Sequence, residues 1–225
     1  MKSDPGHALI LTGGRLDLQF AKDYLQKSDW DFLIVVDGGA HYALQLGLSI
    51  DAAVGDFDTL SREEFALLSR DPGIAWDIHI PQKDETDTEL AIYTAEKLGV
   101  RKITILGATG GRIDHELSNL HMLAYCLERG IEAELVDPQN RISLFRDRKV
   151  FDREQTYGKY ISFIPLTERV EGLTLTGFLY PLQDKTLSIG IESGRCVSNE
   201  LAGEKAEASL KSGILICIES RDRKE

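Results

Sequence analysis

Hydrophobic residues between positions 7 and 140 alternate between two patterns. Short continuous apolar runs that end at Gly, Asp or Thr are separated by longer segments in which apolar residues recur every three or four positions. Continuous apolar runs of this length are typical of strands that are buried on both faces of a sheet. The predicted strands are residues 7–11, 32–36, 52–54, 75–80, 103–106 and 132–136.

The intervening segments have the periodicity of amphipathic helices. Two of them begin with capping boxes, in which Ser61 pairs with Glu64 and Thr86 pairs with Glu89. The predicted helices are residues 16–26, residues 41–46, the segments that follow Ser61 and Thr86, and residues 113–127. Six strands joined by helical crossovers predict an α/β fold, a Rossmann-like parallel sheet with helices on both faces. Ligands bind such sheets at the carboxyl ends of the strands.

The pattern changes beyond about residue 142. Apolar runs become short, they lie between Gly and Asp residues, and helical periodicity is absent. The runs are residues 160–164, 173–176, 186–191, 206–210 and 214–220. This pattern predicts a small antiparallel β-sandwich. We therefore expect two domains, residues 1–142 and 143–225, that pack closely.

Two aspartates follow the predicted strand at residues 52–54. If the backbone there is extended, Asp56 and Asp58 face one way and Phe57 faces the other. Aspartates after a strand are ordinarily turn residues or helix caps. Here Ser61 already supplies the cap of the next helix, so these carboxylates are available to a hard cation such as Mg²⁺.

A glycine-rich turn, residues 107–111, precedes the helix at residues 113–127. Exposed N–H groups at a helix start favour phosphate, and Arg112 can add a bidentate contact. The turn matches neither a P-loop nor the dinucleotide-binding pattern. Gly110 and Gly111 have an alternative explanation, which is tight packing of the strand against the helix. Asp114 has one as well, because an acid in the first turn interacts favourably with the helix dipole.

Two further strand ends are polar. In the segment after residue 80, Lys83 offers a charge to phosphate and Asp87 can turn back as a third metal ligand, although a solvated loop is the alternative. Asp37 precedes Gly38-Gly39 and is by default a turn residue or a helix cap. The candidate residues are Asp37, Gln82, Lys83, Asp84, Thr86 and Asp87.

The composition narrows the class of protein. The 225 residues carry a formal net charge of −11, which argues against nonspecific nucleic-acid binding. No run of residues is apolar enough to predict a membrane span or a signal peptide. Three widely spaced cysteines, Cys126, Cys196 and Cys217, form no zinc or redox pattern. We expect a reducing, cytoplasmic compartment and no membrane partner.

Taken in order, these motifs resemble the thiamine pyrophosphokinase family. The motifs are Asp37-Gly38-Gly39-Ala40, Gly55-Asp56-Phe57-Asp58, Asp84-Glu85-Thr86-Asp87, Gly110-Gly111-Arg112-Ile113-Asp114-His115 and, near the C-terminus, Ser198-Asn199-Glu200. The resemblance covers nearly the whole chain. Each motif alone is weak, whereas five in order at fitting intervals are specific.

The resemblance implies an α/β domain followed by a β-sandwich, in a homodimer with the site between subunits. It implies transfer of a diphosphoryl group from ATP to thiamine with Mg²⁺, giving AMP and thiamine diphosphate. Asp56, Asp58 and Asp87 would bind metal and, with Arg112, serve catalysis, while Ser198 and Asn199 would contact thiamine. The nucleotide and diphosphate site would comprise Asp37, Gln82, Lys83, Asp84, Thr86, Gly110, Gly111, Arg112 and Asp114.

One feature departs from the family pattern. Some members stack an aromatic residue of the second domain, often Trp, on thiamine, but Trp30 and Trp76 both lie in the first domain here. Phe178 and Tyr180 are the candidates that remain. Two other functions stay open, a related-fold 6-hydroxymethyl-dihydropterin diphosphokinase and a non-catalytic Mg-nucleotide-binding module.

Overall fold

The computed structural model describes residues 6–78, 85–191 and 193–222. The chain forms two compact units, Met1–Pro138 and Gln139–Glu225. The division falls four residues before the expected boundary because Asn140 already begins a strand of the second unit.

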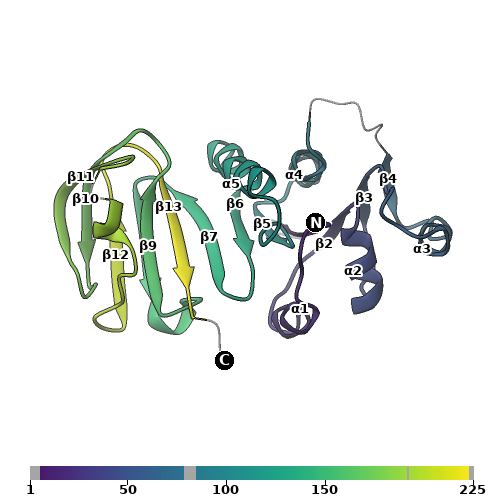
Figure 1. Cartoon of the computed structure of the whole chain (residues 1–225), viewed down its shortest axis with the longest axis horizontal. Coiled ribbons are helices and arrows are strands. Elements are labelled where there is room, and N and C mark those ends of the chain that lie inside the picture. The colour runs from purple at the N-terminus through teal and green to yellow at the C-terminus, as the bar shows by residue number, and fades with distance from the viewer. Residues whose placement is uncertain (1–5, 79–84, 192, 223–225) are drawn as a thin grey trace. The chain divides into compact units, whose positions relative to one another are not determined.

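The first unit is built on a parallel sheet (Figure 1). Its strands are β1 (His7–Leu11), β2 (Phe32–Val36), β3 (Ala52–Gly55), β4 (Ala75–Ile78), β5 (Lys102–Leu106) and β6 (Glu132–Val136). They lie in the order β4-β3-β2-β1-β5-β6, and every pairing within the unit is parallel. The order reverses beside β1, because the chain leaves β1 toward β4 and returns to its other side at β5. Such a switch point is where open α/β sheets bind ligands.

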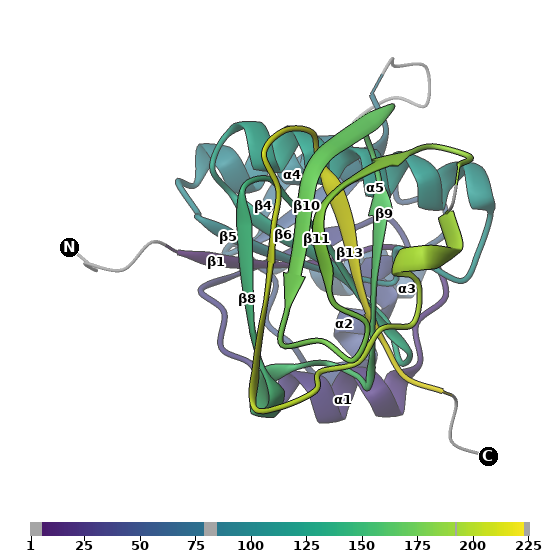
Figure 2. The ribbon, with the colours of Figure 1, turned by 90° about the vertical axis from the view of Figure 1, so that its left-hand side faces the viewer.

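In the described part of this unit, five helices connect the strands. They are α1 (Leu18–Leu25), α2 (Gly39–Leu46), α3 (Arg62–Leu68), α4 (Asp87–Lys97) and α5 (Ile113–Glu128). Helices α4 and α5 cover one face of the sheet and α1 and α2 cover the other (Figure 2). The predicted Rossmann-like α/β architecture is confirmed. Within the described ranges, no helix is both long and apolar enough to span a membrane.

The helix starts follow local capping. Both predicted capping boxes are present, at Ser61 and Thr86. The helix expected from residue 16 begins at Leu18 instead, because the Asp17 carboxylate accepts a hydrogen bond from the Phe20 N–H at 2.9 Å and caps it there.

The second unit consists of two antiparallel sheets (Figure 1). Their strands are β7 (Asn140–Phe145), β8 (Arg148–Asp152), β9 (Tyr160–Pro165), β10 (Arg169–Thr176), β11 (Leu182–Ser188), β12 (Lys205–Ser209) and β13 (Leu215–Ser220). One sheet has the order β7-β13-β9 and the other β11-β10-β12-β8. The predicted β-sandwich is confirmed.

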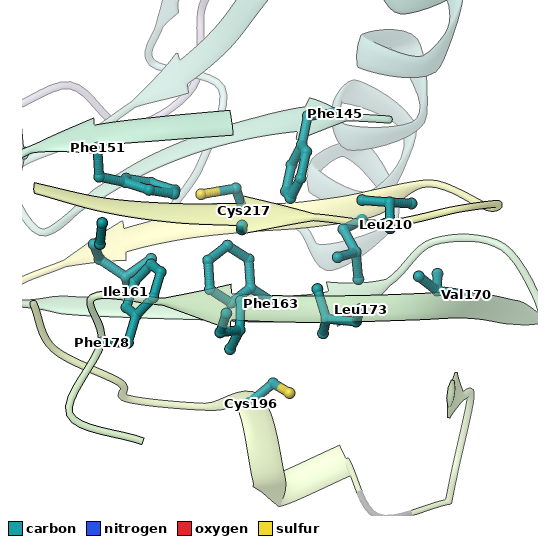
Figure 3. Packing of buried hydrophobic residues seen from close by; sticks show 14 of the residues in the cluster. Phe145, Phe151, Ile161, Phe163, Val170, Leu173, Phe178, Cys196, Leu210 and Cys217 are labelled. Atoms are coloured by element: carbon teal, nitrogen blue, oxygen red, sulfur yellow. The ribbon is translucent and has the colours of Figure 1, made fainter. Parts of the chain in front are cut away.

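The core of the sandwich draws side chains from both sheets (Figure 3). Phe163 of β9 faces Phe151 of β8 and Phe178 edge-on, with ring centroids 5.9 and 5.6 Å apart. Phe163 is 1% exposed and Cys217 of β13 is fully buried beside it. Edge-to-face contacts of this kind add to the stabilisation that burial provides.

Two strands of the sandwich, β7 and β8, were not predicted. The charged residues 146–149 contain a turn and the start of β8. Asp147 has φ 70°, a conformation that Asp tolerates in tight turns. The turn carries the chain from one sheet to the other, so neither strand shows its partner in the local sequence.

Candidate active site

The first unit contains a cavity of about 440 Å³ at the carboxyl ends of its central strands. This volume lies in the range of small-molecule sites. The cavity is lined by loops that follow β1, β2, β3 and β5 and by the starts of α4 and α5. The lining residues are Thr12, Gly13, Gly14, Val36, Asp37, Gly38, Thr59, Thr86, Asp87, Thr88, Gly107, Ala108, Thr109, Gly111, Arg112, His115, Glu116, Ser118 and Asn119.

Glycines let three of these loops approach one another. A Cβ atom on Gly14 would lie 2.1 Å from the Gly107 carbonyl oxygen, and one on Gly39 would lie 2.0 Å from the Leu11 carbonyl oxygen. Real Cβ atoms do not come this close to backbone, so any larger residue would force the loops apart. The strand ends around the cavity are therefore packed backbone against backbone.

Among the acids that line the cavity, Asp37 has the most strongly shifted pKa. Its backbone is left-handed, with φ 44°, and its carboxylate accepts hydrogen bonds from the N–H groups of Asp56 at 3.0 Å and Phe57 at 3.3 Å. Burial first, and then the charge of neighbouring Asp87, raise the pKa of Asp37 to about 6. Two carboxyl groups in contact repel each other unless a proton or a cation lies between them. This excess of negative charge fits a divalent cation.

Gly55 makes room for this arrangement. It has φ 134°, and a Cβ atom there would lie 1.9 Å from the Asp37 carboxylate oxygen Oδ1. The end of β3 and the turn after β2 are therefore joined through the Asp37 side chain.

The backbone across Asp56 and Asp58 is not extended, so the condition for these two side chains to face one way is not met. Strand β3 ends at Gly55, and Phe57 adopts a left-handed conformation with φ 56°. Phe57 is 4% exposed and packs in an aromatic cluster, so the chain turns around it. Asp56 is half-buried and accepts a hydrogen bond from the Asp58 N–H at 3.2 Å, whereas Asp58 is exposed.

The predicted metal ligands are consequently not gathered as a trio. Asp87 interacts with Asp37 in the cavity, whereas neither Asp56 nor Asp58 lines it. Within residues 6–78, 85–191 and 193–222, no three Asp, Glu, His or Cys side chains are placed to hold one metal ion. Asp56 stays connected to the cavity through its N–H bond to Asp37.

The glycine-rich turn opens α5 as expected. Gly107 and Gly110 have φ 77° and 79°, and the Gly111 N–H donates to the Glu116 carboxylate at 2.7 Å. Gly111 and Arg112 line the cavity, whereas Gly110 does not.

Arg112 is the cap residue of α5 and its guanidinium donates to both oxygens of Asp114, at 3.1 and 2.6 Å. These hydrogen bonds lower the pKa of Asp114 to about 2. Both side chains are largely exposed, at 75% and 63%. Asp114 does not line the cavity; it orients the guanidinium fork at the cavity edge.

The polar segment after β4 is only partly described. Gln82, Lys83 and Asp84 lie outside the described residues. Thr86 and Asp87 line the cavity at the start of α4. The Thr86 hydroxyl accepts a hydrogen bond from the Glu89 N–H at 3.2 Å, so its first role is to cap the helix.

Sequence reasoning missed several residues that line the cavity. Asn119 is 8% exposed and donates through Nδ2 to the Ala108 carbonyl at 3.0 Å, which holds the glycine-rich turn against α5. His115, Ser118 and Asn119 occupy positions i, i+3 and i+4 of α5, and this polar stripe was a signal for a helix face turned toward a ligand.

In the second unit, the structure separates the predicted roles of Ser198 and Asn199. Ser198 is exposed, with φ 57°. Asn199 is 1% exposed: its Oδ1 accepts from the N–H groups of Tyr180 at 3.1 Å and Glu200 at 2.9 Å, and its Nδ2 donates to the Tyr180 carbonyl at 2.9 Å. The Asn199 amide therefore holds the backbone that presents Tyr180.

The two candidate stacking residues differ in exposure. Phe178 is 3% exposed within the core of the sandwich, so its ring is not available to a ligand. Tyr180 is 65% exposed on the segment that Asn199 holds. Tyr180 is thus the aromatic residue of the two that can stack on a ligand.

Comparisons with known proteins agree with this architecture. Residues 21–135 match the family model described as thiamin pyrophosphokinase, catalytic domain, and residues 148–215 match thiamin pyrophosphokinase, vitamin B1 binding domain. A thiamine pyrophosphokinase from Bacillus subtilis is 37% identical over 189 residues, which cover 84% of this chain and 87% of that protein.

Solved structures agree as well. The thiamine pyrophosphokinase structure from Bacillus subtilis has a TM-score of 0.85 at 33% identity, covering 96% of this chain and all of that one. The structure of thiamin pyrophosphokinase from Geobacillus thermodenitrificans has a TM-score of 0.83 at 32% identity, covering 97% and 99% of the two chains. With matches over both units, the chain belongs to the thiamine pyrophosphokinase family, whose members are diphosphotransferases.

Proposed function

We propose that this protein transfers the diphosphoryl group of ATP to the hydroxyl of thiamine with the help of Mg²⁺, giving thiamine diphosphate and AMP. The observation that carries the proposal is the contact of the Asp37 and Asp87 carboxyl groups inside a cavity at the switch point of a parallel sheet. Two acids in contact beside a phosphate-compatible helix start form an arrangement that a metal–nucleotide complex can neutralise.

The family resemblance assigns the metal to Asp56, Asp58 and Asp87; the structure does not gather these three side chains, but it places Asp37 beside Asp87. Oxygen ligands of this kind suit Mg²⁺, which would neutralise negative charge on the phosphates. Asp37 joins the set because its carboxylate contacts Asp87 and also accepts the N–H of Asp56. Asp37 thus links the two segments that carry the predicted ligands.

The phosphates would lie against the start of α5. The positive end of this 16-residue helix faces the cavity through Gly111 and Arg112. Arg112 can exchange its two hydrogen bonds to Asp114 for two to a phosphate, because carboxylate and phosphate present the same bidentate geometry. Gln82, Lys83 and Asp84 are proposed to complete this site on the family resemblance alone.

The β-sandwich, within residues 143–225, would bind thiamine and mediate dimerisation. Tyr180 and Ser198 offer an exposed aromatic ring and a hydroxyl next to each other in the fold, and Asn199 positions Tyr180. We also propose a homodimer with the site between subunits and a cytoplasmic location. The three cysteines are buried free thiols, which agrees with a reducing compartment.

One assay tests the reaction. The purified protein is incubated with ATP, Mg²⁺ and either thiamine or 6-hydroxymethyl-dihydropterin, and AMP and product are measured by chromatography. We expect equal amounts of AMP and thiamine diphosphate with thiamine and no AMP with the pterin. AMP formed only with the pterin would assign the other diphosphokinase activity, and nucleotide binding without AMP would assign a non-catalytic module.

A further inference from the structure

Glu116 differs from Asp114, the other acid in the first turn of α5. Asp114 is exposed and does not line the cavity, whereas Glu116 is half-buried and lines it. The Glu116 carboxylate accepts a hydrogen bond from the Gly111 N–H at 2.7 Å. This donor belongs to the glycine-rich turn, against which the proposed function places the phosphates. The carboxylate therefore binds the N–H group that a phosphate oxygen would use.

Carboxylate and phosphate oxygens compete for such donors on similar terms. Both are anionic acceptors that form strong hydrogen bonds with backbone N–H groups, and the positive end of a helix favours either of them. A carboxylate on the same helix is always close to the donor, so its effective concentration there is high. A phosphate group would have to displace the Glu116 carboxylate before it could accept the Gly111 N–H.

The neighbouring Arg112 shows the same arrangement. Its guanidinium lines the cavity and donates to both oxygens of Asp114, at 3.1 and 2.6 Å. Two consecutive residues at the cavity edge thus each donate to a carboxylate from the first turn of α5. The two acids differ in one respect, because only the half-buried Glu116 keeps its charge within the lining of the cavity.

The charges of the lining add to this competition. Among the described residues that line the cavity, Arg112 is the one Lys or Arg side chain, whereas Asp37, Asp87 and Glu116 are carboxylic acids. Asp37 and Asp87 already interact unfavourably with each other. A third acid beside the phosphate position therefore opposes the binding of further negative charge.

We propose that Glu116 lowers the affinity of the cavity for nucleotide phosphate: its carboxylate holds the Gly111 N–H and is displaced when the nucleotide binds. The inference rests on the phosphate position of the proposed function and is independent of which residues hold the metal. Two unit charges about 4 Å apart in water repel by an amount that changes a binding constant about fivefold. A residue that only supported the turn would act in the opposite direction, because its loss would weaken binding.

The test compares Glu116→Gln and Glu116→Ala with Glu63→Gln. Gln keeps an oxygen that can accept the Gly111 N–H but removes the charge, whereas Ala removes both and suits a helix. Glu63 is the matched control, because it is an exposed acid in the first turn of α3 and does not line the cavity. Calorimetry on the full chain measures the binding of α,β-methylene ATP, which cannot be cleaved at the bond that the proposed reaction breaks. The Mg²⁺ concentration is fixed, and each protein is measured at low and at high ionic strength.

At low ionic strength we expect Glu116→Gln to tighten binding about fivefold, Glu116→Ala to tighten it at least as much, and Glu63→Gln to change it less than about twofold. The gain should shrink at high ionic strength, because salt screens charges near the surface. Unchanged or weaker binding in either Glu116 variant, an equal gain in the Glu63 variant, or a gain that salt leaves unchanged would overturn the inference and leave the proposed function intact. If the parent protein and the variants alike bound no nucleotide, the phosphate site of the proposed function would fall, and this inference with it.

Discussion

Replacing Gly55 by Ala tests how the cavity is assembled. Gly55 has φ 134°, and an added Cβ atom would lie 1.9 Å from Oδ1 and 2.7 Å from Cγ of Asp37. The Asp37 carboxylate would have to leave its place, so its hydrogen bonds to the N–H groups of Asp56 and Phe57 would be lost. We expect a large loss of stability together with a loss of activity.

The expected loss of stability has two contributions. A non-glycine residue at such a φ costs about 1–3 kcal/mol, and each hydrogen bond to a charged group contributes about 1.5–3 kcal/mol. We therefore expect Gly55→Ala to lower the free energy of unfolding by about 4 kcal/mol or more. Gly47 is the matched control, because it has φ 66° but nothing within 4 Å of an added Cβ atom. Its replacement by Ala should cost only about 1–2 kcal/mol.

Urea unfolding of a double-mutant cycle separates the two contributions. Asp37→Gly removes the carboxylate that the new Cβ atom would strike, and glycine suits the φ of 44° at that position. In the Asp37→Gly background, Gly55→Ala should cost only the backbone strain, about 1–3 kcal/mol. Equal costs of Gly55→Ala in both backgrounds would refute the role given to the Asp37 carboxylate.

Three further outcomes are expected. Asp56→Asn should lower turnover by about 10²-fold or more, measured as AMP formation, while Asp23→Asn on the exposed face of α1 serves as the control. A near-parent rate would remove Asp56 from the proposed metal site. Arg112→Lys should raise the KM for ATP, because lysine cannot form with phosphate the paired hydrogen bonds that the guanidinium makes with Asp114. Unchanged kinetics would contradict a bidentate phosphate contact. Asn199→Ala breaks three hydrogen bonds to backbone, so it should lower the free energy of unfolding, measured in urea, by about 2–4 kcal/mol and weaken thiamine binding. A loss below about 0.5 kcal/mol would show that water replaces the amide.

Local patterns in the sequence determined much of the first unit. The apolar runs of β1, β2 and β5 are buried on both faces, so their composition alone identifies them as central parallel strands. The capping boxes at Ser61 and Thr86 fixed the starts of α3 and α4 because a cap joins residues three positions apart. The ends of parallel strands share one edge of the sheet, which is why Asp37, Asp87 and Arg112 could be expected around one cavity.

Tertiary packing decided the features that join distant segments. Phe57 turns left-handed because Phe65 and Trp76 bury its ring, and that turn separates Asp58 from the arrangement that strand alternation predicted. Asp37 meets Asp87 only because the turn after β2 and the start of α4 converge, and Asn199 uses its amide on a backbone segment 19 residues away. Local periodicity reports which residues are buried, but it does not report which partners bury them. The sequence therefore determined the elements, the edge of the sheet where the cavity lies and the family, whereas contacts between distant residues decided which carboxylates meet and which aromatic residue faces solvent.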